Sequence, residues 1–324
     1  MTYKEIRSAF ERFLEQEQFD SSVYSMYEAV NYIMSLKAKR FRPVLLLMAY
    51  RMYRSSIADA LPAALGIELF HNFTLIHDDI MDDAGMRRGE IAVHEKFGMN
   101  KAILSGDAMM MLAYMYLQRS SGEEQLAEIF RTMTQTAIEV CEGQDLDMSF
   151  EERSYVTVDE YLHMIALKTS VLLAASLKIG GLLAGAELSD TNHLYAFGRN
   201  LGIAFQIQDD ILDTFGHSED VGKKIGGDIL QKKKTYLYTK AMEILTDASK
   251  DELMAFYRTE KELSPEDVDR VKVLFREGKV LDSANRAQEE YYVLAMEHLE
   301  AVSADEVRKA PLKDISRKLF ERNR

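Results

Sequence analysis

Hydrophobic residues recur along most of the chain with the spacing that places them on one face of an α-helix. The segment 43–54 begins with Pro43, which suits a first helical turn, and continues with apolar residues. A second helix is expected over about 59–84, and 101–118 is apolar on almost every side, as in a buried or interface helix. Runs of alternating β-branched residues are nearly absent, so the pattern predicts an all-α protein.

Helix-start signals and an even composition predict one large unit. Thr157 and Glu160 have the spacing of a capping box, and Ser264 precedes Pro265 as an N-cap residue would. The C-terminal part is amphipathic and highly charged, as in peripheral helices. No low-complexity linker or repeat divides the sequence. We therefore expect a single all-α domain over 1–324 with a buried central bundle.

Composition narrows the class of protein further. The 324 residues include 17 Gly and 4 Pro, few for a sheet protein with many turns. Cys141 is the one cysteine, which excludes an intrachain disulfide and predicts a reduced, cytoplasmic setting. The net charge of -13 argues against nucleic acid as a partner. No segment offers about 18 uninterrupted apolar residues, so a membrane span is not expected.

An acidic group follows an apolar stretch at residues 76–83, which read IHDDIMDD. Because buried unpaired carboxylates are costly, a cation must meet them or they must face water. On a helix, Asp78 and Asp82 share a face and can bind one cation together. The pattern DDxxD recurs at 209–213, within FQIQDDILD. Two such motifs predict hard divalent cations with a polyanion between them, and all-oxygen ligands suit Mg²⁺.

Basic islands interrupt this acidic chain at three places. They read LKAKRFRP at 36–43, RRG at 87–89 and KKIGGDILQKKK at 223–234. Arginine and lysine side chains at several points around Mg²⁺ are what two diphosphate groups would need. The islands together with the paired acidic motifs predict an enzyme that handles diphosphates.

These motifs resemble those of the trans-isoprenyl diphosphate synthases, the polyprenyl synthetase family. The resemblance covers almost the whole chain, most densely 35–235, and rests on LIHDDIMDDAGMRRG, FQIQDDILD, KRFRP, GQDLD and LKTS. It implies a helical bundle around a central cavity. It also implies a prenyltransferase that condenses isopentenyl diphosphate with an allylic diphosphate (dimethylallyl, geranyl or farnesyl), and a homodimer.

The resemblance also assigns roles to individual residues. Three Mg²⁺ ions are expected on the carboxylates of Asp78, Asp82 and Asp209. Further or water-mediated ligands would be Asp79, Asp210 and Asp213. The allylic diphosphate would be held by Arg87, Lys168, Lys223 and Lys233. Isopentenyl diphosphate would be held by Lys39, Arg42, His71 and Arg88. The oxygen dipoles of Thr169 and Gln206 would stabilise an allylic carbocation.

The implied chemistry is electrostatic. Positive charge favours departure of the diphosphate, the double bond of isopentenyl diphosphate attacks the cation, and a proton is lost. The loop 214–234 is expected to close over the site and exclude water. One departure from the family pattern is Lys37-Ala38, where a Gly-Gly pair is usual. Ala38 lacks glycine's freedom at positive φ, which weakens the expectation of a backbone contact there.

Product length is expected to depend on the helix that carries Asp78. Phe73 lies five residues before Asp78, roughly 7 to 8 Å along the helix axis. A large ring at Phe73 beside the small Thr74 predicts a floor part-way down an apolar pocket. In the family, this arrangement resembles geranylgeranyl (C20) synthases, with a farnesyl (C15) or longer product as the alternative. Phe70, about one turn further along, is expected to be core, with a second floor as the alternative.

Three other functions are compatible with parts of the sequence. An HD-type metal phosphohydrolase would use His77 and Asp78 as ligands but would leave the second DDxxD motif without a role. A terpene cyclase shares the Mg²⁺ chemistry but needs no second diphosphate site. A non-catalytic synthase subunit would have lost its motifs, whereas both are intact here. The apolar segment 101–118 is a candidate dimer interface, although a bundle core would look the same.

Overall fold

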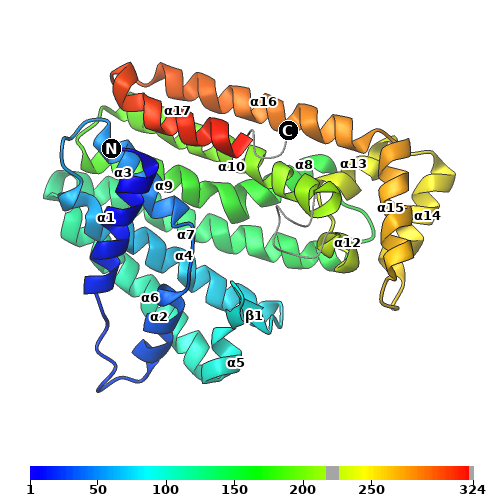
Figure 1. Ribbon diagram of the computed structural model, residues 1–324, viewed down its shortest axis with the longest axis horizontal. Helices are drawn as coiled ribbons and strands as arrows, with labels where there is room; N and C mark the ends of the chain where they lie inside the picture. Colours follow the sequence, from blue (N-terminus) through cyan, green and yellow to red (C-terminus); the bar gives the residue numbers. More distant parts are fainter. Residues whose placement is uncertain (217–225, 321–324) are drawn as a thin grey trace. The chain divides into compact units, whose positions relative to one another are not determined.

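The computed structural model describes residues 1–216 and 226–320, which are helical almost throughout (Figure 1). The described chain contains two short strands, β1 (Met86–Arg87) and β2 (Glu90–Ile91). The all-α prediction is therefore confirmed. The chain divides into two compact units, and a single domain over 1–324 stays a prediction. Unit 1 comprises Met1–Thr134, Ala175–Leu194 and Val302–Leu312, and unit 2 comprises Gln135–Ala174, Tyr195–Ala301 and Lys313–Arg324.

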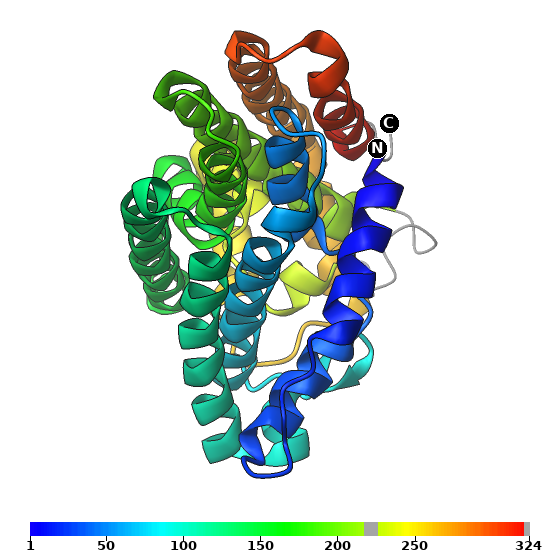
Figure 2. The ribbon, with the colours of Figure 1, turned by 90° about the vertical axis from the view of Figure 1, so that its left-hand side faces the viewer.

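Unit 1 is built around two long helices. Its elements are α1 (Tyr3–Gln16), α2 (Met26–Ser35), α3 (Phe41–Arg51), η1 (Ala58–Ala60), α4 (Leu61–Met81), α5 (Val93–Phe97) and α6 (Met99–Ser120). α4 packs along α6 on one side and contacts α1 on another (Figure 2). The α4–α6 approach is close at Gly66, where a Cβ would lie 2.7 Å from the Ala113 carbonyl oxygen. Most side chains of α3 and α4 are buried, so these helices supply the core of this unit.

A tight hairpin follows α4 in unit 1. β1 and β2 pair antiparallel, with Arg87 opposite Glu90. The two residues between them, Arg88 and Gly89, have φ values of 56° and 81°. Positive φ at both central residues is the mark of a type I′ turn, whose twist matches that of the paired strands. The hairpin was not predicted from the sequence, because two-residue strands leave no alternating pattern.

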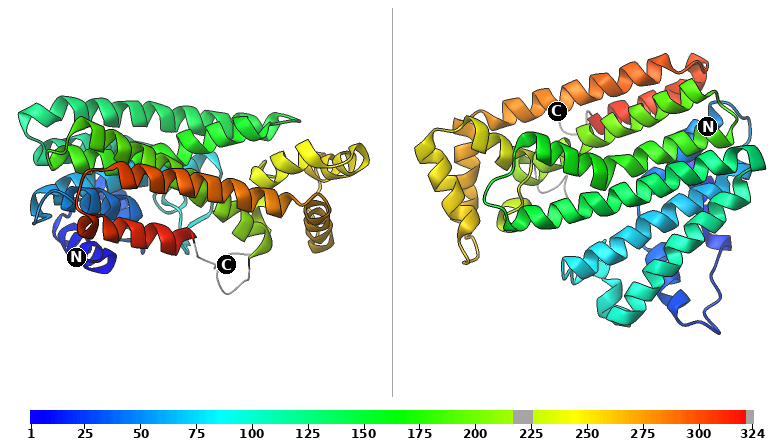
Figure 3. Two further views of the ribbon diagram at one scale, coloured as in Figure 1. Left: turned by 90° about the horizontal axis from the view of Figure 1, so that it is seen from above. Right: turned by 180° about the vertical axis from the view of Figure 1, so that it is seen from behind.

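Unit 2 has an apolar core of its own. The elements wholly within it are α8 (Val158–Ile165), the π-helical turn η2 (Ala166–Ser170), α12 (Gly227–Leu230), α13 (Tyr236–Ile244), α14 (Asp247–Arg258), α15 (Pro265–Glu277) and α16 (Val280–Ala301). Buried side chains of α8, α10, α13 and α15 form one cluster. Figure 3 shows α14 and α15 side by side near one end of α16. The capping boxes at Thr157 and Ser264 are both present.

Four helices of the described chain have residues in both units. They are α7 (Glu123–Glu152), α9 (Val171–Leu183), α10 (Leu188–Phe215) and α17 (Glu306–Phe320). The continuous helical stretch Val158–Leu183 is long and apolar enough to cross a membrane by composition. However, 78% of its most apolar window is buried inside the protein, which is typical of a core helix.

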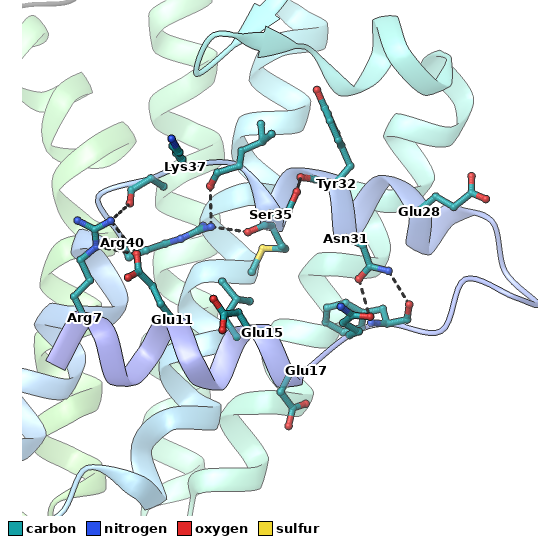
Figure 4. Close-up of a pocket in the computed structure, with 16 residues that line it drawn as sticks. Arg7, Glu11, Glu15, Glu17, Glu28, Asn31, Tyr32, Ser35, Lys37 and Arg40 are labelled. Carbon is teal, nitrogen blue, oxygen red and sulfur yellow. Dashed lines mark hydrogen bonds and ion pairs between the residues drawn. The ribbon is translucent and has the colours of Figure 1, made fainter. Parts of the chain in front are cut away.

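A cavity of about 680 Å³ lies in unit 1 between α1, α2 and the segment that leads into α3. Figure 4 shows side chains of both charges around it, including Arg7, Glu11 and Glu15. None of the described site residues expected from the sequence lines this cavity. Ala38 and Arg40, which flank the expected site residue Lys39, do line it.

Candidate functional site

The first acidic motif lies at the C-terminal end of α4. The helix ends at Met81, and the N–H of Asp82 donates to the Asp78 carbonyl oxygen at 2.8 Å. Asp82 is exposed and Asp78 is half-buried, whereas the Asp79 side chain is fully buried. A cation arriving from solvent therefore reaches the carboxylates of Asp78 and Asp82, and these are hard oxygen donors of the kind that Mg²⁺ prefers.

Asp79 is engaged by the hairpin arginine. The Arg87 Nε lies 2.9 and 3.0 Å from the two carboxylate oxygens of Asp79, and Nη2 donates to the same group. Such a bidentate pair fixes both partners in orientation. Burial alone would lower the Arg87 pKa, but the hydrogen bond and charge of Asp79, with Asp78 and Asp82, raise it overall. Asp79 thus holds Arg87 charged and in place beside the acidic motif.

Basic side chains from α3 and from the hairpin form a cluster beside α4, one to two turns before the acidic motif. Arg42 Nη1 lies 3.1 Å from His71 Nε2, and Arg88 Nη1 donates to the Asn72 side-chain oxygen at 3.4 Å. The Nε of Arg42 is buried and has no hydrogen-bond partner among the residues that the structure describes. Burial lowers the Arg42 pKa to about 10, with Glu68 opposing and Arg88 adding to the shift. A buried guanidinium with an unsatisfied donor is a site that an anion would complete.

The buried carboxylate of Glu68 lies within this basic cluster. Glu68 accepts from Arg40 Nη1 at 2.6 Å and from the Asn72 side-chain amide at 3.1 Å. Arg40 also donates to the Leu36 carbonyl oxygen, and its own φ of 52° turns the chain into α3. The left-handed position in this element is therefore Arg40, whereas Ala38 is not among the described residues with positive φ. The charge of Glu68 also acts on Arg42 and Arg88, and the charge of Asp79 acts on Arg88 as well.

His71 is neutral in this setting. Burial, and then the charges of Arg42, Arg88, Arg87 and Arg40, hold the His71 pKa well below its usual value of 6.5. An uncharged ring can accept from Arg42 through Nε2, which leaves the proton on Nδ1. His71 thus orients Arg42 and offers one N–H of its own, rather than a positive charge.

Phe73 and His77 continue down the face of α4 that meets α6. The Phe73 ring meets Phe70 and His77 edge to face, with centroid distances of 5.4 and 4.9 Å. A Cβ at Gly106 of α6 would lie 2.3 Å from His77 Nε2, which itself approaches the Ile103 carbonyl oxygen at 3.3 Å. His77 is therefore a packing residue against α6. The Thr74 hydroxyl donates to the His71 carbonyl oxygen at 2.8 Å.

The second acidic motif lies in unit 2, near the end of α10. Asp209 is exposed, whereas Asp210 is 2% exposed. Asp210 accepts from the Tyr161 hydroxyl, the Tyr236 backbone N–H at 2.9 Å and the Gln206 amide at 3.3 Å. Burial raises the Asp210 pKa to about 7, and these hydrogen bonds oppose the shift. Asp210 therefore ties α8, α10 and α13 together, and Asp209 is the accessible carboxylate of the adjacent pair.

Asp213 and Lys168 also have defined partners in unit 2. The Asp213 carboxylate accepts from the backbone N–H of Asp228, at the start of α12, at 2.8 Å. Lys168, on the π-helical turn, donates to Asp147 of α7 at 2.5 Å. A Cβ at Gly143 would lie 2.3 Å from the Lys168 backbone nitrogen, so α7 passes directly against this turn. Thr169 on the same turn is half-buried.

Some site residues expected from the sequence make other contacts or lie outside the described residues, and some of the residues that contact the site were not predicted. The Lys39 carbonyl oxygen accepts from the Tyr3 hydroxyl at 2.6 Å, and the Lys233 backbone N–H donates to the Asp228 carbonyl oxygen at 2.9 Å. Lys223 and residues 217–225 of the expected lid lie outside the described residues. The sequence reading did not assign Glu68, Asn72, Asp147 or Tyr161. Glu68 and Asn72 had a signal, because they lie on the same face of an otherwise apolar helix as His71. Tyr161 had none.

Comparison with known proteins agrees with these features. The polyprenyl synthetase family model matches residues 23–275. A geranylgeranyl diphosphate synthase of Methanosarcina mazei is 44% identical over 219 residues, which cover 67% of this chain and 68% of that protein. The crystal structure of a geranylgeranyl pyrophosphate synthase is 39% identical, has a TM-score of 0.93 and covers all of both chains.

A further crystal structure includes bound groups. It is a geranylgeranyl pyrophosphate synthase from Corynebacterium glutamicum complexed with isoprenyl diphosphate and magnesium. That protein is 25% identical, with a TM-score of 0.85 and coverage of 99% of this chain and 98% of its own. From its acidic motifs, its basic cluster and these matches, the chain belongs to the polyprenyl synthetase family.

Proposed function

We propose that the protein is a geranylgeranyl diphosphate synthase, which condenses isopentenyl diphosphate with an allylic diphosphate and releases diphosphate. The observation that carries the proposal lies on α4. Its C-terminal end carries the accessible carboxylates of Asp78 and Asp82, and its His71 contacts Arg42 of the neighbouring α3, whose buried Nε has no partner among the described residues. A metal-dependent hydrolase or cyclase would need the carboxylates but not a second anion site.

Different residues bind the two diphosphates in this proposal. Isopentenyl diphosphate accepts hydrogen bonds from Arg42, Arg88 and Lys39 and from the Nδ1–H of neutral His71, which relieves the unsatisfied guanidinium. The allylic diphosphate is held by Arg87, which Asp79 keeps charged, and by Lys168, Lys223 and Lys233. The role of Asp210 is positional, because its hydrogen bonds hold Gln206 and the adjacent Asp209.

Three Mg²⁺ ions are proposed as the cofactor, with Asp78, Asp82 and Asp209 as direct ligands. When bound, Mg²⁺ neutralises charge on the departing diphosphate. Bound Mg²⁺ fits these residues because they are accessible oxygen donors and the described residues supply no thiolate cluster. The hydroxyl of Thr169 and the amide oxygen of Gln206 stabilise the allylic cation by their dipoles.

The product is proposed to contain 20 carbons. Phe73 is 9% exposed and is supported from behind by Phe70 and His77, so its ring can act as a rigid floor for the growing chain. Thr74 is small, and its hydroxyl donates to the His71 carbonyl oxygen of the same helix. The Thr74 side chain therefore leaves the space beside the Phe73 ring open to the growing chain.

A homodimer is also proposed, because Leu104, Met111 and Met115 of α6 are 56%, 57% and 47% exposed. The protein is expected in the cytoplasm.

A condensation assay tests the proposal. Purified protein is incubated with labelled isopentenyl diphosphate, Mg²⁺ and dimethylallyl, geranyl or farnesyl diphosphate in turn, and the dephosphorylated products are separated by chromatography. A C20 product is expected, and it should vanish in Asp78→Asn/Asp82→Asn but persist in Asp59→Asn, an exposed carboxylate elsewhere in the same unit. Absence of any condensation product with all three primers would contradict the assignment.

A further inference from the structure

A group of metal-ligand side chains lies just beyond the first acidic motif and has no role in the proposed reaction. Asp83 follows α4, and His94 and Glu95 lie on α5. One ligand atom from each of these three side chains lies within 4.8 Å of the other two. Asp83 and Glu95 are exposed, whereas the His94 side chain is 3% exposed.

His94 is the unusual member of this group. Neither of its ring nitrogens has a hydrogen-bond partner within the described part of the chain. Its Nε2 is 3.6 Å from Glu95 Oε1, which is too long for a hydrogen bond. A buried polar group without a partner is destabilising, so a buried imidazole beside two carboxylates points to a ligand held between them.

The backbone brings the three residues together across the hairpin. The Ala92 N–H donates to the Gly85 carbonyl oxygen at 3.0 Å, and Met86 pairs with Ile91. The chain therefore closes on itself between Asp83 and His94. Asp83 has a φ of 49°, in the left-handed region, which few non-glycine residues adopt without a local reason.

We propose that Asp83, His94 and Glu95 form a binding site for a divalent transition-metal cation of the Zn²⁺ class. One imidazole and two carboxylates, with water completing the shell, form a donor set that suits Zn²⁺ and related ions. Mg²⁺ prefers an all-oxygen octahedron. Ligand atoms on one tetrahedral Zn²⁺ lie about 3.3 Å apart at ordinary bond lengths. The two exposed carboxylates can close the remaining gap by side-chain rotation.

This site is separate from the acidic motif, although Asp83 is the next residue after Asp82. Its cation joins the end of α4 to the start of α5 and so clamps the two ends of the hairpin. The hairpin carries Arg87 and Arg88, so the clamp fixes the base of the element that presents both arginines. If the proposed function is correct, metal bound at this site should lower the KM for diphosphate substrates. The proposal that metal binds here does not depend on that function.

The experiment uses the full chain with Asp78→Asn/Asp82→Asn, which removes the accessible carboxylates of the first motif. After treatment with a chelator, the protein is titrated with Zn²⁺ by calorimetry and with Co²⁺ by visible absorption, each without diphosphate. One equivalent of metal is expected to bind. Adding Asp83→Asn/Glu95→Gln should weaken binding at least 10-fold, and so should adding His94→Gln. Adding Glu90→Gln, an exposed carboxylate of the same hairpin, should leave binding unchanged.

Asp83→Asn/Glu95→Gln should fold normally, because both residues are exposed. Circular dichroism tests whether the protein with the buried His94→Gln substitution is folded. Failure to bind one equivalent, or equal binding with and without Asp83→Asn/Glu95→Gln, would overturn the proposal. These outcomes are independent of the condensation assay, which uses the unsubstituted protein with Mg²⁺. Condensation without Zn²⁺ binding would refute this site alone, and Zn²⁺ binding without condensation would refute only the proposed function.

Discussion

At the scale of single residues, Arg42 is the most informative side chain. It is buried, its Nε has no described partner, and its pKa is lowered to about 10 by burial. Arg42→Gln should raise the KM for isopentenyl diphosphate about 10- to 100-fold with a smaller change in kcat, because a hydrogen bond to a charged group contributes about 1.5–3 kcal/mol. Initial rates at varied substrate concentration measure the effect. Arg51→Gln, on the same helix, is the matched control, and equal KM changes in both variants would contradict the assignment.

The lowered pKa of His71 predicts how the stability of the protein depends on pH. The folded-state pKa of His71 lies below the usual 6.5, because of burial and four arginines. Unfolded His71 takes up a proton below pH 6.5 and folded His71 does not, so this group leaves stability unchanged at pH 7.5 and reduces it as the pH falls below 6.5. Melting temperatures of the substrate-free wild type should therefore fall more between pH 7.5 and 5.5 than those of His71→Asn. Parallel curves for the two proteins would rule this out.

The sequence indicated which aspartates could bind a cation but not which of them are buried. The spacing of Asp78 and Asp82 and their repetition at 209–213 predict cation binding. The resemblance to the family gave Asp79 and Asp210 the role of further or water-mediated ligands, which stays a prediction, and in the structure each is buried and hydrogen-bonded to protein groups. A DDxxD motif does not show which carboxylate turns inward, because that depends on which helices pack on each side.

At the scale of elements, α4 carries the proposed metal ligand Asp78 and the proposed floor residue Phe73. Phe73→Leu should shift the products toward longer chains, because a smaller side chain lowers the floor on which the chain end stops. Phe73→Ala should extend them further, although removing a buried ring costs about 3–5 kcal/mol and lowers the melting temperature. Product chromatography with each variant measures the shift. Phe70→Leu, at a fully buried neighbour, is the control, and an unchanged product spectrum in both Phe73 variants would refute the floor assignment.

Regular elements were predictable and irregular ones were not. The helix expected over about 59–84 corresponds to α4, and the capping boxes mark the starts of α8 and α15. The hairpin and the π-helical turn were missed. The type I′ turn requires positive φ at Arg88, a residue that gives no turn signal, and the π turn lies directly against Gly143, which is distant from it in sequence. Both irregular elements carry expected diphosphate-binding residues, so local patterns fail where long-range contacts set the backbone.

At the scale of the whole molecule, α6 was expected to lie in a core or an interface. One face packs on α4, and another exposes Leu104, Met111 and Met115. Met111→Glu/Met115→Glu should convert the proposed homodimer to a monomer, because charges placed in a buried apolar interface lose their hydration. Light scattering after gel filtration measures the mass. Met148→Glu, at a methionine of α7 with 47% exposure, should leave the mass unchanged; a monomeric wild type, or a dimer in the double variant, would contradict the interface.

The π-helical turn Ala166–Ser170 has a consequence for how such chains diverge. A π turn is equivalent to one extra residue inside an α-helix, so deleting one residue there would restore regular winding. The deletion would also turn Lys168 and Thr169 by about 100° relative to α8, because each α-helical residue advances the helix by that angle. A relative that is one residue shorter at this point would therefore keep a regular helix but present different side chains beside Asp147. In this family, a chain with a single-residue gap at this point would retain the fold but lose the contact that Lys168 makes with Asp147.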